Sequence, residues 1–435
     1  MEWSRYNYLF EAEGRYFLYN SLSNCLAELD KDGFIELQQQ INSKVIEVSN
    51  QGRLAQFKQL RVLVDNDDDE INKIRYVSRL KRNNDRHLVL TINPTLSCNF
   101  SCIYCFEQEH SSVTMSDDVE NNIIRFIQHH QSAKSLDITW FGGEPLLAFD
   151  RIVSLTQKMR ALGLDYKAHI ITNGYLLSGK IMAQFGDLAI SSVQVTLDGL
   201  APVHNKRRHL KSGGFTFNRI INNIDVFKAK YPSINVSVRV NIDNTNKDDF
   251  VGVYELFAKR NYPNFQVYPA FVQDLAGRSD SKDIMDRTQQ IEFLKSLRRQ
   301  CNIDIPVFFP KSKRYECSVR NSNSLVIGPS GELYKCWNDV GDESRIVGNV
   351  DGSVRNQNLL LRYLVGADPF EDPKCKSCIL LPVCGGGCPY LRIQNLYEGK
   401  DTNTCPLIKD NLNDFIWLHA QYKNRKESML PYKGF

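Results

Sequence analysis

Six short apolar stretches recur between residues 87 and 270, and stretches with helical spacing lie between them. The predicted strands cover residues 87–93, 136–141, 167–172, 192–197, 234–240 and 265–270. The predicted helices include Asp117–His129, Ile152–Leu162, Phe217–Lys228 and Asp248–Lys259. This alternation predicts an α/β fold with parallel strands and crossover helices. Because six units are too few to close an eightfold barrel, we expect a partial (β/α)6 barrel with its chemistry at the carboxyl ends of the strands.

Two regions of different character flank the alternating segment. In residues 1–85, apolar residues predict two short strands around Glu13 and Gly14, then a helix near Asn24–Gln38. The acid run Asp65–Glu70 is typical of a solvated loop or a helix start. From residue 301, cysteines lie among Gly, Pro and Asn with little periodicity, which is typical of a region organised by bound metal.

We therefore expect three domains. They are a small N-terminal α+β domain (1–85), the partial barrel (86–300), and a cysteine-rich, loop-dominated C-terminal domain (301–435) that ends in an amphipathic helix at Asn411–Lys423.

Composition limits the compartment and the partners. The chain has 435 residues and a net charge of only +4, which argues against a nucleic-acid partner. No apolar run reaches the length of a membrane helix, and the first residues lack the pattern of a signal peptide, so we expect a cytoplasmic protein without a membrane partner. Twelve cysteines in a reducing compartment indicate metal sites rather than disulfides.

Three cysteines follow the first predicted strand directly. Cys98, Cys102 and Cys105 lie in the segment NPTLSCNFSCIYCFEQ. Three thiolates in one short loop can bind three irons of a [4Fe–4S] cluster and leave the fourth iron open. A zinc site is the alternative, but zinc prefers four closed ligands and no fourth Cys or His follows within the loop.

The spacing Cys-x3-Cys-x2-Cys, with an aromatic residue at Tyr104, resembles the signature of the radical S-adenosylmethionine (SAM) superfamily. The resemblance implies that SAM chelates the open iron and that one electron splits it. The 5′-deoxyadenosyl radical so released abstracts hydrogen from a substrate. It thus implies a catalytic role for Cys98, Cys102 and Cys105.

Further motifs follow later strands. The segment Gly142–Pro145 resembles the family's Gly-Gly-Glu-Pro motif, whose backbone would hold the SAM ammonium group; Asn173-Gly174 is either a plain turn or faces the SAM sugar. The stretch from Asp198 to Arg208 resembles the family's Asp-Gly…His-Asp-x-x-Arg pattern, with Asn205 in place of Asp, and could also be a solvated basic loop.

Arg207 is the candidate for the SAM carboxylate, with Arg208 as the adjacent alternative. Arg239 and Asn241 are weaker candidates for adenosine contacts. The candidate SAM-binding residues are Tyr104, Gly142, Gly143, Glu144, Pro145, Thr172, Asn173, Asp198, Arg207 and Arg239.

A second cysteine set lies in the C-terminal third. Its pattern, Cys317-x13-Gly331-x4-Cys336, then Cys375-x2-Cys378-x5-Cys384-x3-Cys388 and Cys405, resembles the seven-cysteine SPASM domain. The resemblance implies two auxiliary [4Fe–4S] clusters, hence three clusters in all. The first would be bound by Cys317, Cys336 and Cys388, and the second by Cys375, Cys378, Cys384 and Cys405.

The fourth ligand of the first auxiliary cluster stays open. Cys301 is a distant candidate, and a site that is open or bound by substrate is simpler. Cys25 and Cys301 are otherwise typical of buried, inert thiols. Two zinc sites are the competing interpretation of the second set.

The SPASM group mostly modifies peptides and proteins. A maturase of ribosomally made precursor peptides, forming a crosslink, is the first hypothesis; residues 1–85 would then bind a leader peptide by strand addition or merely cap the barrel. A flavodoxin or ferredoxin would supply electrons.

Two alternatives stay open. An anaerobic sulfatase-maturating enzyme, which forms formylglycine, usually begins near the triad and has an acidic residue after the second SPASM cysteine; in this chain that residue is Trp337, and neither Asp342 nor Glu343 nearby has an assigned role. An iron–sulfur electron carrier would explain the auxiliary cysteines but not the triad.

Overall fold

The computed structural model describes residues 1–43, 51–105, 112–273, 282–311 and 317–426. The chain divides into two compact units. The first, named the sheet unit, contains residues 84–293 and 322–361. The second, named the cysteine-rich unit, contains residues 1–83, 294–321 and 362–435. In the described part of the chain, no helix is long and apolar enough to cross a membrane.

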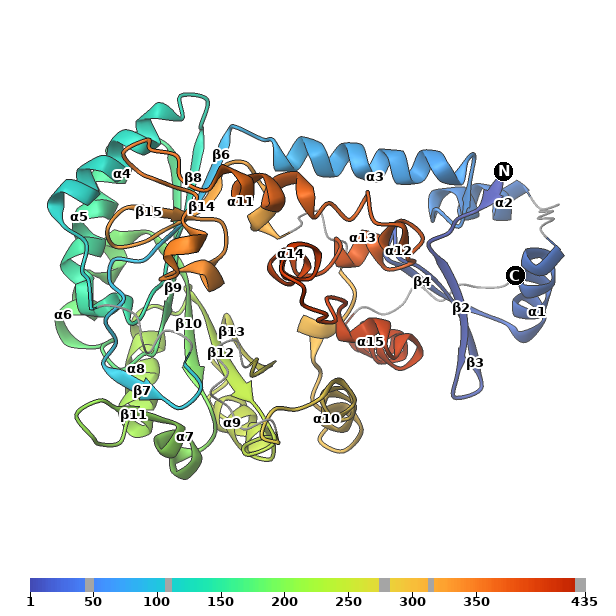
Figure 1. Ribbon diagram of the computed structural model, residues 1–435. Helices are drawn as coiled ribbons and strands as arrows, with labels where there is room; N and C mark the ends of the chain where they lie inside the picture. The colour runs from blue at the N-terminus through green and yellow to red at the C-terminus, as the bar shows by residue number, and fades with distance from the viewer. Residues whose placement is uncertain (44–50, 106–111, 274–281, 312–316, 427–435) are drawn as a thin grey trace. The chain divides into compact units, whose positions relative to one another are not determined.

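The sheet unit is built on a nine-stranded mixed sheet with the order β13-β12-β10-β9-β8-β6-β14-β15-β16 (Figure 1). Its strands are β6 (His87–Ile92), β8 (Ser135–Trp140), β9 (Asp165–Thr172), β10 (Ile190–Leu197), β12 (Asn235–Ile242), β13 (Phe265–Phe271), β14 (Ser324–Ile327), β15 (Glu332–Tyr334) and β16 (Gly348–Asn349). All six expected strands are present, and they pair in parallel. The α/β class is therefore confirmed, in the form of a large mixed sheet.

Helices lie between the parallel strands, as the alternating pattern predicts. They are α4 (Asp117–His129), α5 (Phe149–Arg160), α6 (Gly179–Gln184), α7 (Ala201–Arg207), α8 (Phe217–Lys230) and α9 (Asp249–Ala258). Figure 1 shows α4, α5, α6 and α8 along one side of the sheet. Alternate strand residues such as Leu88, Leu90 and Ile92 are fully buried, which is the pattern of strands beneath helices.

The segment that carries Cys336 joins this sheet rather than the C-terminal cysteines. Strand β14 pairs in parallel with β6, aligning Ser324 with Val89, and β15 and β16 extend the sheet as antiparallel strands. We expected residues 322–361 in the C-terminal domain. These strands have only two to four residues, too few for an alternating pattern to show in the sequence.

The cysteine-rich unit contains a small antiparallel sheet with the order β2-β3-β4. Strands β2 (Asn7–Ala12) and β3 (Arg15–Asn20) meet at Glu13 and Gly14, both with positive φ, as a two-residue hairpin turn requires. The predicted helix near Asn24–Gln38 is partly wrong. Its first residues form β4 (Cys25–Leu29), and α1 (Lys31–Ser43) begins only afterwards.

Residues of the N-terminal segment share their core with the C-terminal helix. Phe10, Phe17 and Tyr19 of the small sheet pack against Ile416 and Trp417 of α15 (Leu412–Lys426). The other face of the sheet packs Leu18 and Leu29 against Leu37 and Phe57 of α1 and α2 (Gln51–Gln59). The N-terminal segment therefore has one core of its own and shares a second with α15, so it belongs to the same unit as the C-terminal helix instead of standing apart as the expected separate domain.

Helix α3 (Asp67–Arg82) makes a second link between the two ends of the chain. The acid run is its first turn: the Asn66 side chain accepts from Asp69 N–H, and acids at this end suit the helix dipole. At its last residue, the guanidinium of Arg82 lies 2.8 Å from the Asp368 carboxylate, and both side chains are buried.

Short elements complete the chain. The short pair β1 (Glu2–Trp3) and β5 (Leu63–Val64) is antiparallel, and α10 (Arg287–Arg299) carries the chain from the sheet unit into the cysteine-rich unit. The remaining helices are α11 (Gln357–Leu361), α12 (Pro373–Lys376), α13 (Leu381–Cys384) and α14 (Pro389–Tyr397).

Candidate active site and cysteine clusters

The cysteine triad lies on the segment between β6 and α4. Cys102 ends the short strand β7 (Phe100–Cys102), which pairs with β11 (Arg208–Leu210), and Phe100 N–H donates to Cys98 Sγ at 3.4 Å. Burial raises the pKa of Cys98 to about 12 and the pKa of Cys102 to about 11. Among the described residues, no three His, Cys, Asp or Glu side chains converge closely enough for a single metal ion. A four-iron cluster instead binds each cysteine to a different iron.

The glycine pair after β8 packs against the loop that leads to Cys98. Glu144 N–H donates to the carbonyl of Ser97 at 2.9 Å. A Cβ atom at Gly142 would lie 2.4 Å from the carbonyl oxygen of Thr95, and one at Gly143 would lie 2.4 Å from that of Ser97. Only glycine fits both positions, so the two loops can touch backbone to backbone.

Glu144 joins the ends of β8 and β9. Its carboxylate is fully buried and accepts hydrogen bonds from Leu146 N–H (3.1 Å), the Thr172 hydroxyl (2.7 Å) and Asn173 N–H (2.7 Å). Burial raises the pKa of Glu144, against the opposing effect of these donors. Pro145 begins the 3-10 turn that follows. The carboxylate is thus occupied by the protein. The N–H groups of Gly143 and Glu144 also donate within the protein, so a ligand ammonium group would be held by backbone carbonyls of this motif.

The end of β9 also contacts the triad loop directly. The Asn173 side-chain amide donates to Asn99 Oδ1 at 2.8 Å, and Asn99 lies next to Cys98. The structure therefore brings three sequence motifs together: the triad, the glycine pair and Thr172–Asn173.

Arg207 lies between two aspartates. Its Nε lies 3.3 Å from Asp198 Oδ2, its Nη1 lies 2.8 Å from Asp243 Oδ2, and its guanidinium stacks over the Tyr104 ring at 5.3 Å. Burial lowers the pKa of Arg207, but the two carboxylates outweigh this effect and raise it. Two of its three nitrogens are occupied, so Arg207 cannot offer a ligand carboxylate both terminal nitrogens.

A chain of polar side chains links Tyr104 to β12. The Tyr104 hydroxyl accepts from Arg208 Nη1 at 2.7 Å and from the Asn241 amide at 2.9 Å, while Arg239 Nε donates to Asn241 Oδ1 at 2.8 Å. The candidates Tyr104, Arg208, Arg239 and Asn241 thus form one network beside the triad.

Several buried polar atoms of this region have no hydrogen-bond partner among the described residues. They are Asn93 Oδ1, Asn99 Nδ2, Asp198 Oδ1, Arg207 Nη2 and Arg208 Nε. An unsatisfied buried polar group costs about 1–3 kcal/mol. These atoms lie at strand ends, in the loops that follow and at the end of α7, in the region where α/β folds bind ligands. Donors and acceptors in this number fit a zwitterionic nucleoside such as SAM.

Four residues of the site were not among the predicted site residues: His204, Asn205, Asp243 and Asn246. His204 is buried, accepts from Asp198 N–H and lies 3.1 Å from the Thr216 hydroxyl, and burial lowers its pKa well below the usual value. Asn246 donates to the Asp198 carbonyl at 2.6 Å. The polar run Asp243–Asn246 directly after β12 was the signal that could have found Asp243 and Asn246.

The hydrogen bonds of Asn205 show why asparagine can replace the aspartate of the family pattern at this position. Its Oδ1 accepts from the N–H groups of Thr216 (2.9 Å) and Phe217 (3.0 Å) at the start of α8. An aspartate would accept the same two bonds, so Asn205 retains the capping function.

Lys409 contacts one of the cysteines assigned to the second auxiliary cluster and interacts electrostatically with two others. Lys409 Nζ lies 3.5 Å from Cys405 Sγ. Burial lowers the pKa of Lys409, but Cys405, Cys378 and Cys375 outweigh this effect and raise it. The fourth, Cys384, ends α13.

The loop between Cys384 and Cys388 depends on glycine. A Cβ atom at Gly387, whose φ is +73°, would lie 2.1 Å from the Thr404 carbonyl oxygen, directly before Cys405. The structure therefore brings this loop against the segment that carries Cys405.

The cysteines assigned to the first auxiliary cluster lie in both units. Cys388 and Cys317 belong to the cysteine-rich unit; burial raises the pKa of Cys388, and the nearby thiol of Cys317 adds to this. Cys336 is buried in the sheet unit, two residues after β15. Cys25 is half-buried, whereas Cys301 is exposed, which corrects the expectation that Cys301 is buried.

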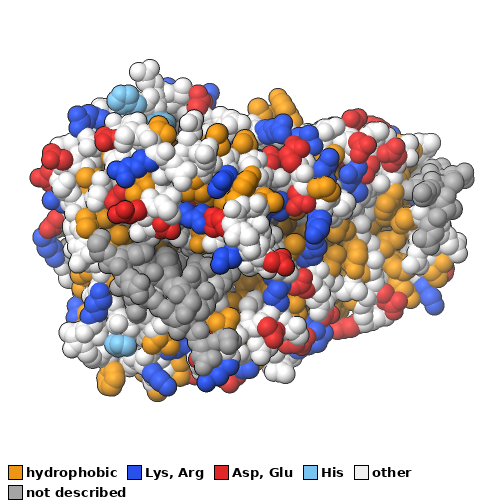
Figure 2. Space-filling view, in the orientation of Figure 1, with side chains coloured by type: hydrophobic (Ala, Val, Ile, Leu, Met, Phe, Trp, Pro, Cys, Tyr) orange, Lys and Arg blue, Asp and Glu red, His pale blue; other side chains and the backbone are white. Residues whose placement is uncertain are grey.

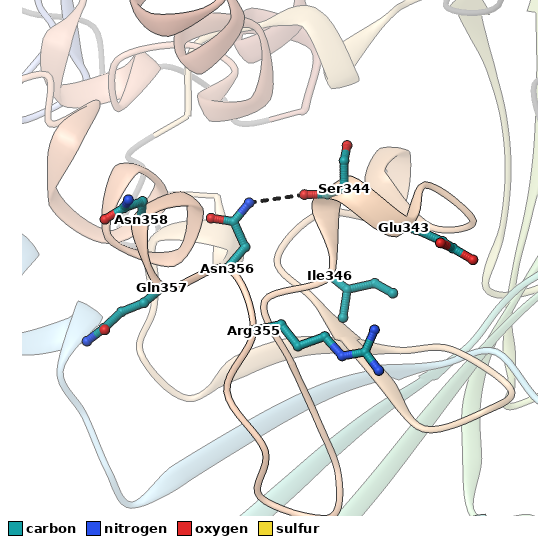
Figure 3. Close-up of a pocket in the computed structure, with 7 residues that line it drawn as sticks. All are labelled: Glu343, Ser344, Ile346, Arg355, Asn356, Gln357 and Asn358. Carbon is teal, nitrogen blue, oxygen red and sulfur yellow. Dashed lines mark hydrogen bonds between the residues drawn. The ribbon is translucent and has the colours of Figure 1, made fainter.

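The residue after Cys336 lies at the glycine motif. The Trp337 ring packs against Phe141, with 5.5 Å between ring centroids, and Phe141 directly precedes Gly142. Further along, Glu343 lines a polar hollow of about 500 Å³ with Ser344, Ile346, Arg355, Asn356, Gln357 and Asn358 (Figure 3). None of the motif residues lines this hollow.

Comparison with known proteins agrees with this geometry. Residues 65–257 match the radical SAM superfamily. The chain is 24% identical over 320 residues to the serine-type anaerobic sulfatase-maturating enzyme of Klebsiella aerogenes, covering 67% of this chain and 77% of that one. It is 22% identical over 349 residues to the cysteine-type enzyme of Clostridium novyi (strain NT), covering 73% and 92%.

Two solved structures share the fold. One is anSMEcpe with bound AdoMet and Cp18Cys peptide, which has a TM-score of 0.61 and 19% identity and covers 79% of this chain and 99% of that chain. The other is Streptococcus suis SuiB bound to S-adenosylmethionine, with a TM-score of 0.53, 18% identity, and coverage of 93% and 100%. This chain is therefore a radical SAM enzyme, and its cofactors are S-adenosylmethionine and [4Fe–4S] clusters.

Proposed function

We propose that this enzyme is a maturase of ribosomally made precursor peptides. When bound, SAM and the triad's cluster would supply a 5′-deoxyadenosyl radical that takes a hydrogen atom from a residue of the peptide. Closing the crosslink would release one further electron and one proton, for which the auxiliary clusters would serve as the electron exit. The observation that carries the proposal is the small sheet of the cysteine-rich unit. In the described residues, β2 and β4 each pair with β3 alone, so each offers a free edge for strand addition by a leader peptide.

The extent of the structural likeness supports this proposal. The SuiB structure covers 93% of the chain, whereas anSMEcpe covers 79%. SuiB has also been solved with the precursor peptide SuiA, at a TM-score of 0.51 to this chain. The chain thus shares with SuiB a larger part of its length than it shares with anSMEcpe.

Trp337 is a further observation in favour of peptide maturation. It follows Cys336 directly, where sulfatase maturases tend to have an acidic residue that serves as base. Its indole packs against Phe141 at the glycine motif, and 44% of its surface is exposed. An indole cannot accept a proton at neutral pH, so this position offers a hydrophobic wall rather than a base.

Sulfatase activation is the second candidate function. It is favoured by the sequence relatives from Klebsiella aerogenes and Clostridium novyi, which are sulfatase-maturating enzymes. The discriminating experiment incubates the reduced enzyme and SAM with either a sulfatase-derived peptide or the precursor peptide encoded beside its gene. Mass spectrometry showing formylglycine in the first peptide and an unchanged second peptide would reverse the proposal.

We assign the ten cysteines of the two sets to three clusters, as the sequence motifs imply. The anaerobically reconstituted protein is then expected to bind about twelve irons per chain. Alanine at Cys98, Cys102 and Cys105 should abolish SAM cleavage, because these residues hold the SAM-binding cluster. Alanine at Cys375 and Cys378 should preserve part of the SAM cleavage while product is lost; an equal loss in both variants would contradict this division.

Strand addition of the leader can be tested without altering the enzyme. Only alternate residues of an added strand donate their N–H groups to the sheet edge. Leader peptides methylated at single backbone nitrogens should therefore lose affinity with a period of two, measured by anaerobic fluorescence titration. A period near 3.6, or no period, would indicate another mode of leader binding.

We place the enzyme in the cytoplasm, where low-potential electron carriers are available. A flavodoxin or ferredoxin is the expected reductant.

A further inference from the structure

A basic stretch of sequence pairs with the strand that carries Cys102. From Gly199 to Asn223 the sequence contains no Asp or Glu, whereas it contains Lys206, Arg207, Arg208, His209, Lys211 and Arg219. Arg207 and Arg208 are buried, but Lys206 and Lys211 are exposed to solvent. In Figure 2, Lys and Arg side chains lie beside hydrophobic ones at the lower left, over β7, β11 and α7.

An exposed aromatic ring borders the same hollow as Lys206. Phe215 exposes 83% of its surface, which is unusual for a phenylalanine in a monomeric protein. It borders a shallow hollow of about 530 Å³ that is lined by Ala201, Pro202, Asn205, Lys206, Phe215 and Asn218. We name Lys206, Lys211, Phe215 and this hollow the ribbon surface, after the two-stranded ribbon β7–β11.

The ribbon surface is joined to the triad segment by backbone hydrogen bonds: Lys211 N–H donates to the Asn99 carbonyl at 2.9 Å, next to Cys98. Arg208 of β11 is paired with Cys102, and His209 is paired with Ser101. Paired strands lie about 4.8 Å apart. Beyond Cys102, Ile103 N–H donates to the Arg207 carbonyl at 3.2 Å, and 51% of the Ile103 surface is exposed. The backbone on both sides of β11 is therefore bonded directly to the segment that carries the triad.

We propose that the ribbon surface docks an acidic one-electron carrier protein. The cations attract an acidic partner and accelerate its association, and the exposed ring provides an apolar anchor at the centre of the contact. The carrier loses one electron, and the iron–sulfur centre held by Cys98, Cys102 and Cys105 gains it; no atom is transferred. This inference rests on the assignment of those cysteines as cluster ligands, but not on the identity of the substrate.

The test compares two electron sources on the reconstituted enzyme. Lys206→Glu/Lys211→Glu reverses the charge of the ribbon surface. The matched control, Lys134→Glu/Lys259→Glu, reverses two exposed lysines at the opposite, amino-terminal edge of the parallel strands. SAM cleavage is measured first with dithionite, and then with a bacterial flavodoxin that is reduced by NADPH and its reductase.

We expect the ribbon variant to lose about tenfold in flavodoxin-driven SAM cleavage at low salt. With dithionite it should match the wild type, and the control should match the wild type with both reductants. Added salt should slow the flavodoxin reaction of the wild type and leave that of the variant nearly unchanged. Phe215→Ser should weaken flavodoxin binding without changing the salt dependence.

Two results would overturn the proposal. The first is an unchanged flavodoxin rate in both the ribbon variant and Phe215→Ser. The second is a loss of dithionite-driven SAM cleavage, in both variants, as large as the loss with flavodoxin. That result would show that these residues support the cluster itself. Loss of precursor-peptide binding with a normal flavodoxin rate would assign the surface to the peptide instead. Because SAM cleavage needs no peptide, a failure of the peptide-maturase proposal would leave these results unaffected.

Discussion

At the residue scale, several residues of the sequence motifs contact other parts of the protein and thereby connect the loops of the site. Gly142 and Gly143 allow one loop to touch another, and the Glu144 carboxylate is consumed by three donors of the protein. Sequence motifs identify such residues without saying what they contact. The tertiary structure indicates that Glu144 is a positioning residue that connects two strand ends.

Replacement of Glu144 tests this role. Glu144→Ala leaves three donors without an acceptor, so the free energy of unfolding should fall by about 3 kcal/mol and SAM affinity should fall with it. Glu144→Gln, the matched control, retains one carbonyl oxygen. Its free energy of unfolding and its SAM affinity should therefore fall clearly less than those of Glu144→Ala. Anaerobic urea unfolding and SAM titration measure both effects. Wild-type stability in Glu144→Ala would show that the three bonds contribute nothing.

At the element scale, short irregular elements position the auxiliary cysteines. The three glycines between Cys384 and Cys388 all have positive φ, and Gly387 lies against Thr404. The spacing of the cysteines was readable in the sequence, but the loop that brings them together has no periodicity from which it could be predicted.

Gly387→Ala should remove iron from the cysteine-rich unit. Its Cβ would clash with the Thr404 carbonyl at 2.1 Å and displace the loop from Cys405. Gly399→Ala is the matched control, because Gly399 has a similar φ of +70° and nothing within 4 Å of the added Cβ. Iron content should fall only in Gly387→Ala, while SAM cleavage persists. Equal iron in both variants would contradict this role of the loop.

The Arg82–Asp368 pair should behave as a buried ion pair that ties α3 to the C-terminal segment. Asp368→Ala leaves Arg82 buried without this partner and should lower the free energy of unfolding by about 3–5 kcal/mol. The double replacement Arg82→Met/Asp368→Leu should recover most of this loss. A double-mutant cycle by denaturant unfolding measures the coupling, and additive single effects would show that the pair is not coupled.

The Arg82–Asp368 pair should also make the free energy of unfolding depend on pH. Burial alone would raise the pKa of Asp368, but Arg82 and Phe370 N–H outweigh it and lower the pKa. A carboxylate with a lowered pKa contributes stability above its unfolded pKa of about 4 and loses it as pH falls through the folded pKa. The difference in the free energy of unfolding between wild type and Asp368→Asn should therefore become smaller below about pH 4. A constant gap would contradict the ionised pair.

At the scale of the whole molecule, the two chain ends form one unit. Phe10 and Phe17 share a core with Trp417, and Tyr6 and Ile71 share another with Phe370. Deletion of residues 1–83 should therefore expose the core of the cysteine-rich unit and reduce the iron content as well as leader binding. Iron analysis of the truncated protein checks this. An unchanged iron count would show that the C-terminal cysteines fold independently.

The sequence by itself determined the chemistry and the six parallel strands. Cys98, Cys102 and Cys105 lie within one short segment, and strand and helix periods are local, so neighbouring residues carry all the information. Only the tertiary structure decided the partners of Glu144 and Arg207, the pairing of β14 with β6, and the union of residues 1–83 with α15. These contacts join residues far apart in the chain, and no local pattern records which distant partner a buried side chain will meet.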